Sequence, residues 1–178
     1  MDLDRAAAYV EQEEGYRARV YRCPTGALTI GIGYNLDAGM PHDEAVLLLR
    51  HRLAKIHAEL SNKLPFFGRL SEIRQAALIS MAYQMGTDGL LAFKRTLASI
   101  EAGHYDTAGR EMLESKWARQ TPERAQRTAY MIRYDRWPDM RAIAAPCQVP
   151  KTPFSLPSLL VGVFFCKKAS QCDIFSCK

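Results

Sequence analysis

Residues 13–33 read EEGYRARVYRCPTGALTIGIG, and this stretch decides how the first part of the chain folds. Residues 24–26, Pro-Thr-Gly, are a turn signal because proline and glycine supply the dihedral angles that tight turns require. After this turn, large apolar residues alternate with threonine and glycine over residues 27–33, which is typical of a β-strand. Before the turn, Gly15 follows a helical pattern that ends in Glu14. We therefore expect a helix that ends at Glu14, followed by a β-hairpin.

The length of the hairpin loop decides which side chains share a face of the sheet. If residues 24–26 form a three-residue loop, Cys23 pairs with Ala27 and Tyr21 pairs with Thr29. Cys23 and Thr29 are then diagonal neighbours on one face, about 7–8 Å apart or less. A two-residue loop would place them on opposite faces. A site that uses both side chains therefore depends on the three-residue loop.

The first helix carries its own start and stop signals. Asp2 can cap its N-terminus, and Gly15 can close it as a residue in the left-handed region. One face of this helix is apolar at helical spacing and ends in a carboxylate, with Leu3, Ala7, Val10 and Glu14 as its members. Glu14 is either a solvated helix end or a carboxyl group at the edge of an apolar interface. The hairpin that follows favours the second interpretation.

The rest of the body has helical periodicity. A long helix is expected to begin near Pro41 and to end at Leu64-Pro65, with an apolar stripe formed by Ala45, Leu48, Leu49, Leu53, Ile56 and Leu60. Two helical patterns within residues 71–100 flank residues 86–89, and another covers residues 106–117. Thr121 is interpreted as the cap of a helix that runs to Ile132, with Pro122 at its first position. The predicted fold class is α+β, mostly helical with one small antiparallel sheet.

Composition sets limits on domain number and partners. The chain has 178 residues, of which 48% are hydrophobic and 24% charged, as in an ordinary soluble protein with one core or two lobes around a cleft. The net charge of +5 favours an anionic partner, although a solvated basic surface has the same composition. The first residues carry acids and lack a long apolar segment, so we expect no secretory signal.

The character of the sequence changes near its end. Residues 144–178 contain four of the five cysteines, four prolines, and four lysines against one acid. We therefore divide the chain into a body, residues 1–143, and a cationic, cysteine- and proline-rich tail, residues 144–178. The apolar run at residues 159–165 is too short to span a bilayer as a helix. The tail is either an appended segment or a membrane-active peptide.

Several blocks of the body occur together in one known family, in the same order and spacing. They are Glu14-Gly15, Tyr21, residues 29–33, residues 84–86, Trp117 and residues 120–125. On these blocks the chain resembles the phage-type lysozymes, from about Leu3 to Met140. The resemblance implies a lysozyme-like fold with a cleft between two lobes. It also implies an endolysin that hydrolyses the β-1,4 bond between N-acetylmuramic acid and N-acetylglucosamine in bacterial peptidoglycan.

The resemblance implies roles for three residues of the helix and hairpin. Glu14 matches the proton donor of the family, and Thr29 matches its threonine. Cys23 occupies a position that holds aspartate in the best-known member and cysteine in some relatives. A thiol is a poor general base, whereas a thiolate can accept a proton or stabilise an oxocarbenium-like transition state. The alternative is that Cys23 is a small hairpin residue that only fills space.

The resemblance also suggests residues that contact the substrate. These substrate-binding candidates are Asn35, Tyr83, Gln84, Thr96 and Arg124. Gln84 and Arg124 match the residue type of the family, and Arg124 is expected on the cleft side near Glu14. Three large aromatic residues, Phe93, Trp117 and Trp137, are interpreted as core residues.

The expected partner is bacterial peptidoglycan, with membrane contact only through the tail, no nucleic acid, and a monomeric state. The four histidines lack the spacing of a metal site, so no metal or cofactor is expected. Synthesis is expected in the host cytoplasm, without a signal peptide, and action on peptidoglycan in the periplasm. Two alternatives remain: a lytic transglycosylase, which uses one glutamate and no water, and an inactive peptidoglycan-binding module.

Overall fold

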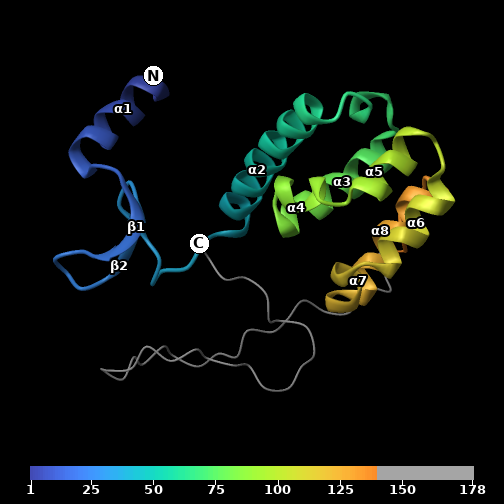
Figure 1. The fold of residues 1–178 in the computed structure, drawn as a ribbon. Helices are drawn as coiled ribbons and strands as arrows, with labels where there is room; N and C mark the ends of the chain where they lie inside the picture. Colours follow the sequence, from blue (N-terminus) through green and yellow to red (C-terminus); the bar gives the residue numbers. More distant parts are fainter. Residues whose placement is uncertain (140–178) are drawn as a thin grey trace. The chain divides into compact units, whose positions relative to one another are not determined.

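The computed structural model describes residues 1–139, so the predicted tail at residues 144–178 lies outside the described residues. The chain divides into two compact units, unit 1 at residues 1–52 and unit 2 from Leu53 onward. Figure 1 shows helices in both units and a small sheet in unit 1. The sheet has three antiparallel strands, and helices make up most of the rest. The predicted α+β fold class is confirmed.

Unit 1 begins with helix α1 (Leu3–Glu14), whose two ends follow the predicted signals. The Asp2 carboxylate accepts hydrogen bonds from the backbone N–H groups of Asp4 and Arg5, each at 3.1 Å. At the other end, the Gly15 N–H donates to the carbonyl of Glu11 at 2.9 Å, and Gly15 has a φ of 69°. Its ψ of 160° is extended, so Gly15 ends the helix without adopting the left-handed helical conformation. Local sequence signals thus fix where Glu14 lies, at the last residue of α1.

The sheet of unit 1 has the order β1-β2-β3, formed by Arg17–Arg22, Leu28–Gly31 and Tyr34–Asn35. Strand β1 is irregular, because Arg17 pairs with Gly31 while Tyr21 pairs with Thr29. Four steps along β1 therefore face two steps along β2, which is a bulge. The Arg17 guanidinium lies 4.4 Å from the centre of the Tyr21 ring, across the bulge. Apolar and polar residues do not alternate regularly over residues 16–23, which agrees with this irregular pairing.

Helix α2 (His42–Lys63) begins directly after Pro41 and ends directly before Leu64-Pro65, as predicted. Its apolar stripe is buried only in the second half, at Ile56 and Leu60. Leu48 and Leu49 in the first half are exposed. None of the helices in the described part of the chain is both long enough and apolar enough to cross a membrane.

Unit 2 is helical. After α2 it contains a short 3-10 helix η1 (Phe67–Arg69) and six α-helices: α3 (Glu72–Met85), α4 (Thr87–Leu91), α5 (Lys94–Glu101), α6 (Tyr105–Glu114), α7 (Lys116–Gln120) and α8 (Pro122–Tyr134). Two expectations need correction. Residues 86–89 were predicted to separate two helices, but residues 87–89 belong to the short helix α4, and only Gly86 separates it from α3. Residues 106–117 were predicted as one helix, but Ser115 ends α6 and its hydroxyl caps α7 by accepting from the Ala118 N–H at 3.0 Å.

The predicted cap of α8 is also different. The Thr121 hydroxyl donates to the Trp117 carbonyl at 3.1 Å and makes no hydrogen bond to the first turn of α8. Pro122 does occupy the first turn, and its fixed φ suits a helix start. Thr121 therefore finishes α7, and Pro122 supplies the start signal of α8.

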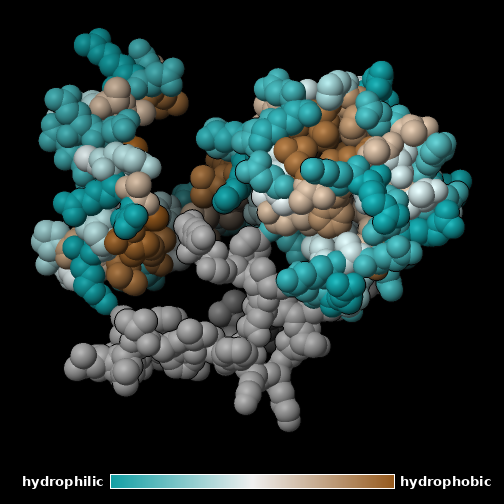
Figure 2. Space-filling model, viewed as in Figure 1, coloured by the Kyte–Doolittle hydropathy of each residue, from teal (hydrophilic) through white to brown (hydrophobic). Residues whose placement is uncertain are grey.

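The core of unit 2 is apolar and well packed. Its largest fully buried side chains are Leu60, Phe67, Leu78, Met81, Leu90, Ile100, Met112 and Ile132. Burying one side chain of this size contributes about 1.5–3 kcal/mol relative to leaving it exposed. Figure 2 shows hydrophilic residues over much of the visible surface of this unit. Unit 2 thus has a core of its own.

One polar cluster joins three helices of unit 2. On α3, the Arg74 guanidinium donates to Asp135 at 3.2 Å and to the Ile132 carbonyl at 2.9 Å. The same guanidinium lies 3.6 Å from the centre of the Tyr105 ring on α6. The Ser71 hydroxyl, which caps α3, donates to the other carboxylate oxygen of Asp135. Asp135 ends α8 with a φ of 53°, a left-handed conformation that aspartate tolerates.

We expect Asp135→Asn to lower the free energy of unfolding by about 1–2 kcal/mol, because a partly buried charged hydrogen bond is lost. Asparagine accepts the left-handed conformation as well as aspartate does, so backbone strain does not contribute. Urea denaturation measures the change. Asp88→Asn is the control, because Asp88 is almost fully exposed in its pair with Lys63 and should change stability by less than about 0.5 kcal/mol. Equal effects of the two substitutions would contradict the role assigned to Asp135.

Candidate functional site

The hairpin has the three-residue loop on which the predicted site depends. The Cys23 N–H donates to the Ala27 carbonyl at 3.0 Å, and the Gly26 N–H donates to the Cys23 carbonyl at 2.8 Å. Tyr21 is the partner of Thr29 in the sheet. Gly26 has a φ of 89°, which an L-residue rarely adopts, so glycine suits this position of the loop. The predicted register is confirmed, and Cys23 and Thr29 lie on the same face.

Thr29 and Cys23 differ in how far solvent reaches them. Thr29 is only 5% exposed, and its hydroxyl donates to the Ala27 carbonyl at 3.3 Å. Cys23 is a free thiol at intermediate exposure, with its Sγ atom 2.9 Å from the Thr25 hydroxyl oxygen. The hairpin thus presents one buried hydroxyl and one accessible sulfur on the same face.

The hydrogen bonds around Cys23 favour its charged form. The pKa of the Cys23 thiol is lowered to about 7, mainly by the hydrogen bond from the Thr25 hydroxyl. Partial burial acts in the opposite direction, and the Thr29 hydroxyl and the backbone of Thr25 and Ala27 lower the pKa further. A free thiol has a pKa of about 8.5, so Cys23 carries far more thiolate at neutral pH than an ordinary cysteine.

Glu14 reaches the sheet at the other end of β2. A Cβ atom placed on Gly33 would lie 3.1 Å from Oε2 of Glu14, so a larger residue there would require the carboxylate to shift by a few tenths of an ångström. Gly33 also has a φ of 71°, in the region that glycine favours. Gly31 has a similar φ of 67°, but a Cβ atom there would meet nothing within 4 Å. The carboxylate of Glu14 therefore packs against the turn between β2 and β3.

Asn35 lies beside Thr29, because these two residues pair in strands β3 and β2. The Asn35 side chain accepts a hydrogen bond from the Asp37 N–H at 3.0 Å, and Asp37 accepts one from the Leu28 N–H at 2.9 Å. Sequence reasoning missed Asp37, which ties the start of β2 to the segment after β3. An Asn-x-Asp pattern after a strand is the signal for this turn.

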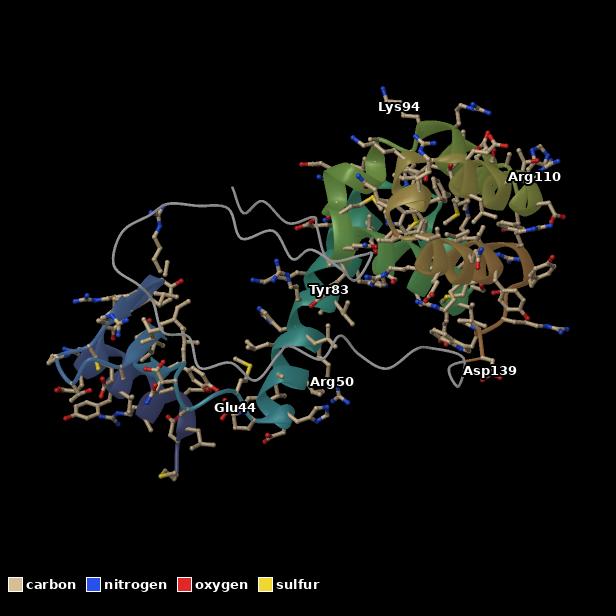
Figure 3. The ribbon with its side chains drawn as sticks, turned by 90° about the horizontal axis from the view of Figure 1, so that it is seen from below. Glu44, Arg50, Tyr83, Lys94, Arg110 and Asp139 are labelled. Atoms are coloured by element: carbon tan, nitrogen blue, oxygen red, sulfur yellow. The ribbon has the colours of Figure 1, made fainter. Side chains whose placement is uncertain are left out.

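The remaining substrate-binding candidates are in unit 2. Tyr83, labelled in Figure 3, is 43% exposed near the end of α3. The neighbouring Gln84 accepts a hydrogen bond from the Trp117 indole N–H at 3.0 Å. Thr96 is buried on α5, with 4% of its surface exposed, and its role in substrate binding stays a prediction.

Arg124 lies in the first turn of α8, where the helix dipole disfavours a positive charge. Its guanidinium donates to the Ser80 hydroxyl at 3.3 Å. Burial lowers the pKa of Arg124, the nearby Arg127 lowers it further, and Tyr83 acts in the opposite direction. Arg124 is thus a half-buried cation beside a second cation, and an anionic or strongly polar ligand would stabilise it.

Two of the three aromatic core predictions are confirmed. Trp117 is buried, and Phe93 packs edge-on against it with ring centres 6.2 Å apart. Trp137 is 61% exposed, so its interpretation as a core residue was wrong. Within residues 1–139 no three His, Cys, Asp or Glu side chains gather in a way that would hold a metal ion.

Known proteins with similar sequences show to which family this chain is related. Residues 11–130 match the family described as phage lysozyme. The chain is 26% identical over 153 residues to probable T4-type lysozyme 1 of Dictyostelium discoideum, covering 69% of this chain and 90% of that protein. It is 25% identical over 122 residues to the endolysin of Acyrthosiphon pisum secondary endosymbiont phage 1, covering 65% and 79%.

A third relative is the pre-baseplate central spike protein Gp5 of Enterobacteria phage T4. The chain is 26% identical to it over 155 residues, covering 71% of this chain and 27% of that protein. The family match includes Glu14, Cys23, Thr29 and Arg124, together with the whole hairpin.

A pair of glycine substitutions tests the contact between Glu14 and the sheet. We expect Gly31→Ala and Gly33→Ala each to lower the free energy of unfolding by about 1–2 kcal/mol, because both residues have a positive φ. Gly33→Ala should lose slightly more, because its methyl group requires the Glu14 carboxylate to shift. Urea denaturation of the single variants gives these values.

The same substitutions in a Glu14→Ala background complete the test. Removing the carboxylate should abolish the extra loss at Gly33 and leave the loss at Gly31 unchanged. An extra loss at Gly33 that persists without Glu14 would show that the carboxylate does not pack there.

Proposed function

The chain belongs to the phage lysozyme family, and we propose that it is an endolysin that hydrolyses the β-1,4 bond between N-acetylmuramic acid and N-acetylglucosamine in bacterial peptidoglycan. Glu14 is the general acid, and Cys23 and Thr29 hold the attacking water and stabilise the transition state. The observation that carries the proposal is the hairpin register, which brings the Cys23 sulfur and the Thr29 hydroxyl to one face of the sheet, while the Glu14 carboxylate lies near Gly33, just after β2.

The reaction needs one group that gives a proton and one that takes a proton. Glu14 donates its proton to the glycosidic oxygen as the bond from the anomeric carbon to that oxygen breaks. The Thr29 hydroxyl orients a water molecule, whose oxygen forms the new bond to the anomeric carbon. The Cys23 thiolate accepts the proton that this water releases. An inverting reaction of this kind needs about 6.5–9.5 Å between the two catalytic groups to leave room for the water.

The state of Cys23 decides whether it can serve as the base. A neutral thiol cannot accept the proton, whereas a thiolate can. Because hydrogen bonds lower the pKa of Cys23 to about 7, a large fraction of the enzyme carries the thiolate at neutral pH. A catalytic base is most effective when its pKa lies near the operating pH. The lowered pKa therefore supports a catalytic role over the interpretation that Cys23 only fills space.

Several polar residues are proposed to bind the glycan. Asn35 is exposed next to Thr29, and Tyr83 is accessible at the end of α3. The Gln84 carbonyl oxygen is engaged by Trp117, which orients its amide nitrogen as a donor for sugar or N-acetyl oxygens. Arg124 supplies a cation for a polar or anionic group of the substrate. Thr96 is 4% exposed, about as little as Thr29 at 5%, so burial alone does not remove it from this set.

The proposal also states where the protein acts and in which oligomeric state. We propose synthesis in the host cytoplasm and action on peptidoglycan in the periplasm by a monomer without a cofactor. A basic net charge of +5 suits a polymer that carries carboxylates. The division of the chain into a catalytic body, residues 1–143, and a separate tail is part of the same proposal.

We expect Glu14→Gln to reduce the clearing of outer-membrane-permeabilised Gram-negative cells by about 100-fold or more, because general acid catalysis contributes about 10²–10⁴-fold. Cys23→Ala should reduce clearing by about tenfold or more, because the base is lost while the acid remains. Turbidity loss over time measures both, with circular dichroism to show that each variant is folded. Full clearing by folded Glu14→Gln would exclude Glu14 as the acid, and no clearing by any form, wild type included, would favour the binding module.

The reaction products separate hydrolysis from transglycosylation. We expect mass spectrometry of digested peptidoglycan to show reducing N-acetylmuramic acid ends, each carrying the added water. Digestion in water enriched in oxygen-18 should add two mass units per cleavage. A lytic transglycosylase would instead give 1,6-anhydro ends without the label, and this outcome would leave Thr29 and Cys23 without their proposed roles.

A further inference from the structure

We propose that Thr25 is a positioning residue for the reaction, because its hydroxyl holds the Cys23 sulfur and donates a hydrogen bond to it. This inference rests on the proposed function of Cys23 as the base. Thr25 lies at the centre of the hairpin loop, where the sequence alone indicates only a turn residue. The inference follows from the loop backbone, from the hydrogen-bond geometry at the sulfur, and from the nature of the groups around it.

The loop backbone fixes Cys23 and Thr25 relative to each other. Backbone hydrogen bonds join Cys23 to Ala27 at 3.0 Å and Gly26 to Cys23 at 2.8 Å. The Arg22 guanidinium donates to the Gly26 carbonyl at 2.9 Å and so braces the far side of the loop. Since Pro24 also has a restricted φ, little backbone freedom remains between Cys23 and Thr25. The Thr25 side chain is therefore presented to the sulfur by a well-defined loop.

The Thr25 hydroxyl is the better placed of the two hydroxyls near the sulfur. Its oxygen lies 2.9 Å from Cys23 Sγ. A hydroxyl has one proton, and a thiolate can only accept, so Thr25 is the donor when the sulfur is charged. The Thr29 hydroxyl lies 3.3 Å from the Ala27 carbonyl, to which it donates, and it lowers the pKa of Cys23 less than the Thr25 hydroxyl does. Thr25 is therefore the main hydroxyl donor to the sulfur.

Neutral hydrogen-bond donors, rather than a counter-ion, stabilise the charged sulfur. Among the described residues, none of the causes that shift the pKa of Cys23 is a nearby charge. Three ionisable side chains of the hairpin region have other partners: Arg22 donates to the Gly26 carbonyl, Asp37 accepts from the Leu28 N–H, and the Tyr21 ring lies beneath Arg17. The Thr25 hydroxyl is the largest cause of the lowered pKa of Cys23. Removing this hydroxyl should therefore raise the pKa of the Cys23 thiol toward that of an ordinary cysteine.

The pH dependence of Cys23 alkylation tests this inference without requiring turnover. Iodoacetamide reacts with the thiolate, and the tryptic peptide of residues 23–50 contains Cys23 as its single cysteine, so mass spectrometry of the full-length protein isolates its rate. We expect a midpoint near pH 7 in the wild type. Thr25→Val has nearly the shape of threonine without the hydroxyl, and it should shift the midpoint upward toward about 8.5. Thr25→Ser keeps the hydroxyl and should restore the wild-type midpoint.

The pH profile of cell-wall clearing links the thiol to the reaction. Because the thiolate is the active form, the rising limb of the wild-type profile should lie near pH 7 and should move to higher pH in Thr25→Val. At pH 7 this variant should lose activity by roughly tenfold, in line with its smaller thiolate fraction. Thr25→Ser should again match the wild type.

The outcomes separate the inference from the function on which it rests. An unchanged alkylation midpoint in Thr25→Val would overturn the inference while leaving the roles of Glu14 and Cys23 intact. A shifted midpoint with an unshifted clearing profile would also overturn it, because the charge on Cys23 would then not limit the reaction. Glu14→Gln should abolish clearing and leave the alkylation profile unchanged, so loss of the general acid is not confused with loss of the thiolate.

Discussion

The hydrogen bond from the Cys23 N–H to the Ala27 carbonyl is the constraint on which the site depends. It closes a three-residue loop, and this loop length places Cys23 and Thr29 on the same face of the sheet. Because side chains alternate along a strand, a slip of one residue would turn one of them to the opposite face. Gly26 permits the backbone of the loop, and the Asp37 carboxylate holds the first residue of β2. Polar contacts therefore fix the register of a sheet with only three short strands.

Most of the fold follows from signals that act over a few residues. The ends of α1 and α2 were predicted correctly, because Asp2, Gly15 and Pro41 influence only the neighbouring backbone. The bulge in β1 was not predicted, because it depends on how one strand pairs with another. The break at Ser115 and the hydroxyl bond of Thr121 were also missed. In both cases a hydroxyl donates to a carbonyl of the preceding turn, and the sequence pattern does not decide whether such a side chain bonds backward, forward or, like Ser115, in both directions.

The site shows the same division between local and distant interactions. The pairing of Cys23 and Thr29 could be predicted, because both belong to one hairpin whose loop is visible in the sequence. The contact of Gln84 with Trp117 and the burial of Thr96 could not be predicted, because they depend on the packing of helices that are far apart in the sequence. The role of Thr25 was not predicted for another reason. A threonine between a proline and a glycine is expected in any turn, and only the side-chain geometry shows that its hydroxyl contacts the Cys23 sulfur.

The use of neutral donors around Cys23 has a consequence for the chemistry. A lysine or arginine beside the sulfur would lower its pKa more strongly than a hydroxyl does, but it would also place a full positive charge close to the anomeric carbon. The transition state of glycoside hydrolysis develops positive charge at that carbon, so a nearby cation would oppose the reaction. The Thr25 hydroxyl and the backbone N–H groups favour the thiolate without this cost. An aspartate at the same position would be ionised above about pH 4 and would need no such help. A cysteine in this position therefore requires neutral donors, and the hairpin loop supplies them.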